Sequence, residues 1–93
     1  MEKQARAHAV ISGRVQGVFF RMETKYAADE VGVFGWVRNK RDGTVEAVFE
    51  GSEKSVMSIL KWCKKGPPVS TVTNVDVTWE DYKGEFSSFD VTY

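Results

Sequence analysis

The chain has 93 residues and a mass of 10.5 kDa, which suits one domain with one modest hydrophobic core. Its hydrophobic fraction of 42% argues against intrinsic disorder. Thirteen basic residues balance thirteen acidic ones, whereas a protein that mainly binds nucleic acid would carry a basic excess. We therefore expect a single domain over residues 1–93, with residues 1–6 as a flexible N-terminus and no nucleic-acid partner.

The single cysteine, Cys63, and the single histidine, His8, limit the chemistry available to the chain. One cysteine cannot form an intrachain disulfide, which suits a reducing compartment, and these two residues are too few for a usual zinc site. No apolar run approaches the roughly 20 residues of a membrane span, and no signal peptide is evident at the N-terminus. We expect a cytoplasmic protein with no metal, no cofactor and no membrane partner.

The first third of the chain predicts a strand, a loop and a helix. Residues 8–12 are short, apolar and partly β-branched, as in a strand, and the two glycines within 13–18 are typical of a loop. From Phe20 to about Val31 the pattern becomes helical, and Gly32 suits the end of that helix. The apolar face of this helix is expected to contain Phe20, Tyr26, Ala27 and Val31.

The middle third predicts a hairpin and a second helix. Residues 34–37 and 45–49 have strand patterns, and Asp42-Gly43 between them indicates a tight turn, because glycine adopts positive φ without steric cost. Ser52 is the expected N-cap of the helix that follows. The apolar residues at helical spacing in this helix are Val56, Ile59, Leu60 and Cys63, and Gly66-Pro67-Pro68 ends it.

The last third predicts two more strands, which together with the earlier elements define a fold. Apolar and polar residues alternate over 75–80, a charged turn covers 81–85, and the apolar residues of 89–93 share one face. The order is β-α-β-β-α-β with a short strand appended. Right-handed crossovers place both helices on the same face, so we predict an α+β fold: a ferredoxin-like sandwich of an antiparallel sheet with two helices on one face. This fold serves many functions and defines none of them.

The segment Gly13–Arg21 carries the clearest chemical signal. It joins a strand to a helix N-terminus, where loop amides and the free N–H groups of the first helical turn can bind an anion. Arg21 lies in that first turn, where a cation is unfavourable for the helix dipole, and its presence makes sense if an anion lies beside its guanidinium. A tight turn with a solvated arginine is the structural alternative, and spacing alone does not separate the two.

Two longer patterns show that the sequence resembles the acylphosphatase family. The family's loop Gly-x-Val-Gln-Gly-Val-x-Phe-Arg is present as Gly13–Arg21. Its second pattern, Gly-Trp-Val-x-Asn followed by Asp-Gly-Thr-Val-Glu, is present as Gly35–Asn39 and Asp42–Glu46. The resemblance covers roughly residues 7–93 in the right order. Phe19 fills a variable position of the first pattern, where glycine or phenylalanine would both be unremarkable.

The resemblance implies that the protein hydrolyses acyl phosphates to a carboxylate and inorganic phosphate. Its partners would then be a small-molecule acyl phosphate and inorganic phosphate, as product and inhibitor, and we expect a monomer. The resemblance also implies that Arg21 binds the phosphate together with loop amides and that Asn39 positions the attacking water. The residues that would supply these amides are Gln16, Gly17, Val18, Phe19 and Phe20.

Two other functions fit the same fold. One is a non-catalytic module that binds an anion or RNA, because aromatic residues beside arginines are typical of RNA-recognition surfaces. The neutral charge and the position of these aromatics at a helix start both count against it. The other is a domain that binds carbamoyl phosphate within a larger maturation enzyme, because domains that resemble this family occur in such enzymes. A chain of 93 residues favours a stand-alone enzyme.

Overall fold

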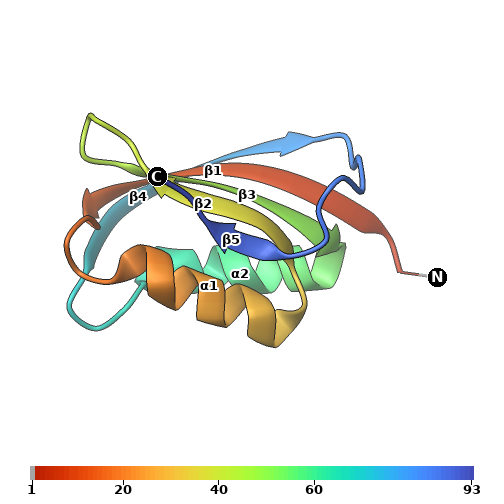
Figure 1. The fold of residues 1–93 in the computed structure, drawn as a ribbon, viewed down its shortest axis with the longest axis horizontal. Helices are drawn as coiled ribbons and strands as arrows, with labels where there is room; N and C mark the ends of the chain where they lie inside the picture. The colour runs from red at the N-terminus through yellow and green to blue at the C-terminus, as the bar shows by residue number, and fades with distance from the viewer. Residues whose placement is uncertain (1) are drawn as a thin grey trace.

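The structure, a computed structural model, describes residues 2–93 and confirms the expected order of elements. Figure 1 shows both helices on one face of a curved sheet. The elements are β1 (Gln4–Arg14), α1 (Phe20–Val31), β2 (Phe34–Asn39), β3 (Val45–Ser52), α2 (Glu53–Lys65), β4 (Thr71–Glu80) and β5 (Phe89–Val91). Within residues 2–93, no helix is long and apolar enough to cross a membrane.

The sheet has the strand order β4-β1-β3-β2-β5 and is not antiparallel throughout. The first four strands of that order pair antiparallel, as predicted, but β5 pairs with β2 in parallel, with Gly35 opposite Phe89. The predicted antiparallel sheet is therefore confirmed for these four strands, and the appended strand β5 makes the sheet mixed. The physical reason is that residues 81–88 do not form a hairpin from β4. They carry the chain to the opposite edge of the sheet, and β5 then enters beside β2 in the same direction (Figure 1).

The core lies between the sheet and the helices. Ala7, Ala9 and Ile11 of β1 alternate with more exposed residues and are fully buried under the helices. In α2 the four predicted apolar residues are all buried, and the Ser52 hydroxyl caps the helix by accepting from the Ser55 N–H at 3.2 Å.

The buried face of α1 agrees in part with the predicted one, because Phe20 is buried and Ala27 and Val31 pack against the core. Phe20, Thr24 and Ala28 are the buried residues, whereas Tyr26 is largely exposed. Spacing of four residues along a helix places these three side chains in one row. Thr24 tolerates burial because its hydroxyl donates to the Phe20 carbonyl at 2.7 Å. A pattern based on hydrophobicity does not identify Thr24 as buried, because threonine is polar.

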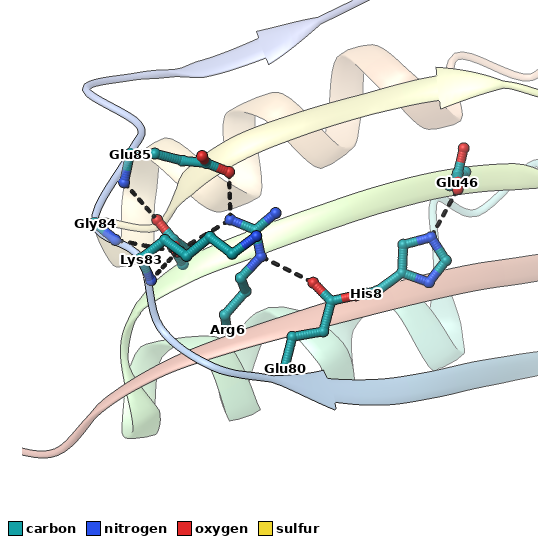
Figure 2. A network of polar contacts seen from close by, with 8 residues as sticks. Arg6, His8, Glu46, Glu80, Lys83, Gly84 and Glu85 are labelled. Carbon is teal, nitrogen blue, oxygen red and sulfur yellow. Dashed lines mark hydrogen bonds and ion pairs between the residues drawn. The ribbon is translucent and has the colours of Figure 1, made fainter.

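The start of β1 also differs from expectation. Residues 4–6 were expected to belong to a flexible N-terminus, but the structure pairs them with β3, from Gln4 opposite Ser52 to Arg6 opposite Glu50. Figure 2 shows Arg6 between the carboxylates of Glu80 and Glu85, with N···O distances of 2.9 and 2.6 Å. A third carboxylate, Glu50, lies 3.2 Å away and is itself only 3% exposed.

Glu50 also fastens the segment that leads to β5. Its carboxylate accepts from the backbone N–H groups of Lys83, Gly84 and Glu85 at 2.8 to 3.2 Å (Figure 2). One buried carboxylate therefore accepts hydrogen bonds from three backbone N–H groups and from the guanidinium of Arg6. The crossing of residues 81–88 to the far edge of the sheet is therefore held by an acidic residue of β3.

Replacing Glu50 with glutamine is expected to lower the free energy of unfolding at pH 7 by about 2–4 kcal/mol. The Arg6 charge would lose its most buried partner, and the amide NH2 group would face a backbone donor. Glu80→Gln is the matched control, because Glu80 contacts the same guanidinium but is 39% exposed and should cost less than about 1 kcal/mol. Urea unfolding measures both, and equal losses would contradict the role given to Glu50.

The loss in the free energy of unfolding that Glu50→Gln causes should depend on pH. Burial raises the pKa of Glu50, but hydrogen bonds from the backbone of 83–85 and from Arg6 outweigh burial and hold the pKa below its ordinary value. A carboxyl with a depressed pKa stabilises the folded state fully above its unfolded pKa of about 4.3, and this stability is lost as pH falls through the folded value. The difference between the two proteins should therefore shrink below about pH 4.

Candidate active site

The loop between β1 and α1 has the backbone of an anion-binding nest. Gly17 has φ 72° and Phe19 has φ 63°, with a residue of negative φ between them. Alternation of right- and left-handed backbone makes successive N–H groups converge on one point. Phe19 is also the N-cap residue of α1, and within the described chain its side chain makes no capping hydrogen bond. The first-turn amides are therefore free to bind a ligand.

Arg21 lies in the first turn of α1 and lines a pocket of about 280 Å³ together with this loop. One guanidinium nitrogen donates to the Thr92 carbonyl at 3.4 Å, and the guanidinium lies 4.8 Å from the centre of the Tyr93 ring. Both contacts come from the residues after β5, which places the end of the chain beside the loop. They orient the side chain while leaving most of its five N–H donors unused.

Asn39 lines the same pocket, so the residues of the two sequence patterns lie together as predicted. It is the last residue of β2, where it pairs with Val45 before the chain turns back. Its Oδ1 atom is buried and has no hydrogen-bond partner among residues 2–93. A buried acceptor without a partner is costly and uncommon, and this one belongs to a residue that lines the pocket.

Gln16 connects the two halves of the site, in a way that the sequence did not indicate. Its side-chain amide donates to the carbonyls of Lys40 and Thr44, at 2.7 and 2.8 Å. The loop is thereby tied to the hairpin that follows Asn39. This hairpin is itself ordered as predicted, because the Asp42 carboxylate accepts from the Thr44 N–H at 3.0 Å. The side chain of Gln16 is therefore a positioning group.

Only part of the predicted amide set lines the pocket. Gly17, Phe19 and Phe20 do, whereas Gln16 and Val18 do not. Val18 is buried in the core, and the backbone roles of these two residues stay predictions. Four lining residues were not among the predicted site residues. They are Val15, Met22, Val91 and Tyr93.

The residues that might suggest other chemistry lie elsewhere. His8 pairs with Glu46 on the open face of the sheet, at 2.7 Å (Figure 2). Burial raises the pKa of the Cys63 thiol to about 12, so this side chain is a buried neutral thiol in α2. Among the described residues, 2–93, no group of three or more His, Cys, Asp or Glu could hold a metal ion.

One aromatic residue of the loop is unavailable for stacking on a nucleic-acid base. Phe20 is only 2% exposed, and its ring packs against Trp62 of α2 with centroids 5.6 Å apart. A module that binds RNA through this segment would need exposed ring faces. Phe20 is therefore unavailable for such stacking, whereas the neighbouring Phe19 is exposed.

Comparisons with known proteins identify the family of the chain. A family model described as "Acylphosphatase" matches residues 7–91. A relative named acylphosphatase from Pelotomaculum thermopropionicum is 54% identical over 90 residues, covering 97% of this chain and 98% of the relative. A crystal structure of acylphosphatase from Bacillus subtilis superposes with a TM-score of 0.92 at 36% identity, covering 96% of this chain and 99% of that one.

A second solved structure, an acylphosphatase from Coxiella burnetii, gives a TM-score of 0.91 at 37% identity and covers 96% of this chain and 93% of that one. The resemblance drawn from the two sequence patterns is thereby confirmed, and so is the ferredoxin-like fold class apart from the direction of β5. The chain belongs to the acylphosphatase family, whose members hydrolyse acyl phosphates to a carboxylate and inorganic phosphate.

Proposed function

We propose that hydrolysis takes place in the pocket between the β1–α1 loop and the end of β2. In this proposal Arg21 and the loop amides bind the phosphoryl group, and Asn39 positions the attacking water. One observation supports it above the others: Arg21 and Asn39, from separate sequence patterns, line a single pocket.

The phosphoryl group is bound by charge and by directed donors. The guanidinium of Arg21 is a planar fork that can hold two phosphoryl oxygens at once. The third oxygen accepts from backbone amides of the loop around Gly17 and Phe19, whose left-handed backbone is typical of anion-binding nests. These donors are in place before the substrate arrives, so they stabilise the negative charge of the transition state with little reorganisation.

Asn39 acts on the water without removing a proton from it. Its carboxamide oxygen accepts a hydrogen bond from the water, which directs a lone pair of the water oxygen at phosphorus. A loose transition state requires little nucleophilic strength, so a strong base is unnecessary. A new P–O bond to water forms while the P–O bond to the acyl carboxylate breaks, and the water protons finally reside on the phosphate product or in solvent.

The leaving group explains why so few residues are needed. The departing carboxylate has a conjugate acid with a pKa of about 4, so no general acid has to protonate it. We propose that hydrolysis needs neither a cofactor nor a metal. We also propose that the protein acts as a monomer and a single domain in the cytoplasm, without nucleic-acid or membrane partners. The neutral charge and the single cysteine favour these proposals.

Phosphate release from benzoyl phosphate tests the proposed function. We expect turnover without added metal, no change on adding EDTA, and competitive inhibition by inorganic phosphate. A non-catalytic anion-binding module would instead bind phosphate and release none from the substrate. Release no faster than the uncatalysed background, measured with protein of verified native circular dichroism, would refute the proposal.

A further inference from the structure

The pocket has more apolar surface than phosphate binding requires. Besides Arg21, Asn39 and the loop backbone, it is lined by apolar or aromatic side chains that have no part in the steps proposed above. These are Val15, Phe19, Met22, Val91 and Tyr93. Three of them are well exposed: Phe19 at 77%, Met22 at 45% and Tyr93 at 95%. A cluster of exposed apolar side chains beside a small polar site indicates a ligand with an apolar part.

Phe19 is the most unusual member of this cluster. Its backbone is left-handed, with φ 63° and ψ 19°, a conformation that disfavours bulky side chains. Its ring is also exposed, so burial in the core does not offset the strain. Glycine would fit this backbone without strain, and phenylalanine is therefore not as unremarkable here as the pattern suggested. A residue that is locally unfavourable and packs on nothing is expected where a ligand supplies the missing contact.

Phe19 and Met22 lie beside Arg21 in the sequence, and Phe19, Met22 and Tyr93 all line the pocket together with Arg21. Phe19 precedes α1 as its left-handed N-cap residue, and Met22 lies in the first turn of the helix. The Tyr93 ring lies over the guanidinium of Arg21 from the other segment of the site. An acyl phosphate whose phosphoryl group is held by Arg21 therefore has Phe19, Met22 and Tyr93, here called the apolar rim, in the same pocket.

We propose that Phe19, Met22 and Tyr93 form the acyl-binding part of the site and make the enzyme selective for acyl phosphates with apolar acyl groups. This inference rests on the proposed function, because it assumes that Arg21 holds the phosphoryl group. Each methylene that the rim removes from water contributes to binding, and full burial would raise affinity about four-fold per methylene. The rim is open on one side, so about two- to four-fold per methylene is expected.

A neighbouring hollow provides the competing possibility. It is lined by Arg38, Lys40 and Arg41, and it shares Asn39 and Tyr93 with the pocket. An acyl group with a second negative charge could turn toward these side chains. Arg38 is already paired with Glu46 at 2.7 Å, however, and Lys40 and Arg41 lie in the solvated hairpin turn. The apolar rim is the more developed surface, and the experiment distinguishes the two.

Kinetics with acetyl, propionyl, butyryl and succinyl phosphate test the proposal. The first three differ only in methylenes and share one leaving-group chemistry. We expect kcat/KM to rise about two- to four-fold per methylene, mainly through KM. Succinyl phosphate has the same four acyl carbons as butyryl phosphate, with a carboxylate in place of the terminal methyl group, and it should be at least ten-fold poorer than butyryl phosphate. A flat series, or a preference for succinyl phosphate, would overturn the proposal.

Variants locate the effect at the rim. Phe19→Asn keeps a residue that tolerates left-handed backbone but removes the apolar ring, and Met22→Gln removes apolar character without changing length. Each should lower the rise in kcat/KM per methylene to below about 1.5-fold. Met57→Gln is the matched control, since Met57 is a similarly exposed methionine on α2 outside this pocket. A wild-type slope in both rim variants would refute their role.

Failure of this inference can be told apart from failure of the proposed function. Inhibition by inorganic phosphate reports on the phosphate site alone, and phenylphosphonate adds an apolar group to the same anion. We expect phenylphosphonate to inhibit wild type at least five-fold better than methylphosphonate, and Phe19→Asn to remove that difference. Equal inhibition by the two phosphonates, with acetyl phosphate still hydrolysed, would overturn the role proposed for the apolar rim and leave the proposed function intact.

Discussion

Arg21→Gln is expected to reduce kcat/KM for acyl phosphates by at least about 10³-fold and to abolish inhibition by millimolar phosphate. Glutamine has one short amide group in place of a charged fork, so it can neither pair with two phosphoryl oxygens nor offset their charge. Arg21→Lys should keep part of the binding, because the charge remains while the fork is lost. Steady-state kinetics and phosphate inhibition measure both effects.

Arg14→Gln serves as the control for the Arg21 variants. Arg14 is an exposed arginine at the end of β1 and does not line the pocket. Its loss changes the net charge by the same amount, so a purely long-range charge effect would appear in both variants. We expect Arg14→Gln to keep activity within about three-fold, as is usual for exposed charges outside a site. Normal phosphate inhibition in Arg21→Gln would contradict the role proposed for Arg21.

Asn39→Ala is expected to separate catalysis from phosphate binding. Loss of the group that orients the water should lower kcat by about 10²- to 10³-fold, while the inhibition constant for phosphate stays within about three-fold. The structure also predicts little loss of stability, because the Oδ1 atom of Asn39 has no protein partner among residues 2–93 to leave unpaired. Thermal unfolding monitored together with kinetics would distinguish a catalytic role from a structural one.

Two further variants sharpen the Asn39 experiment. Asn39→Asp has nearly the same shape but places a negative charge beside the phosphoryl group, so it should weaken phosphate binding as well as turnover. Asn74→Ala removes an exposed asparagine of β4 outside the pocket and should behave as wild type. Retention of activity in Asn39→Ala would refute the water-positioning role, whatever the result for the aspartate variant.

Sequence patterns predicted the secondary structure well where a helix end or a turn depends on residues that are close in sequence. The bounds of α1 agree with the predicted helix, and the Asp42-Gly43 turn joins β2 to antiparallel β3 as expected. Each of these features depends on residues that are close in sequence, such as a cap, a turn or a regular spacing. The buried face of α1 was predicted less well, because Thr24 is polar and pairs with its own helix.

Contacts between distant segments could not be predicted in this way. The place of β5 at the far edge of the sheet depends on Glu50, which binds the backbone of residues more than thirty positions away. The pairing of residues 4–6 with β3 depends on the same carboxylate through Arg6. No periodicity in the sequence encodes such a partner, because any exposed acidic residue has the same local pattern.

The sequence by itself determined the fold class, the family and the two residues proposed to bind the phosphoryl group and to position the attacking water. It did so because Arg21 and Asn39 belong to specific patterns of contiguous residues. Only the tertiary structure decided that these residues share a pocket, that Gln16 ties the loop to the hairpin, and that an apolar rim lies beside them. The registers of β1 and β2 on β3, with Ile11 and Asn39 both opposite Val45, bring these segments together, and register is a property of the whole sheet.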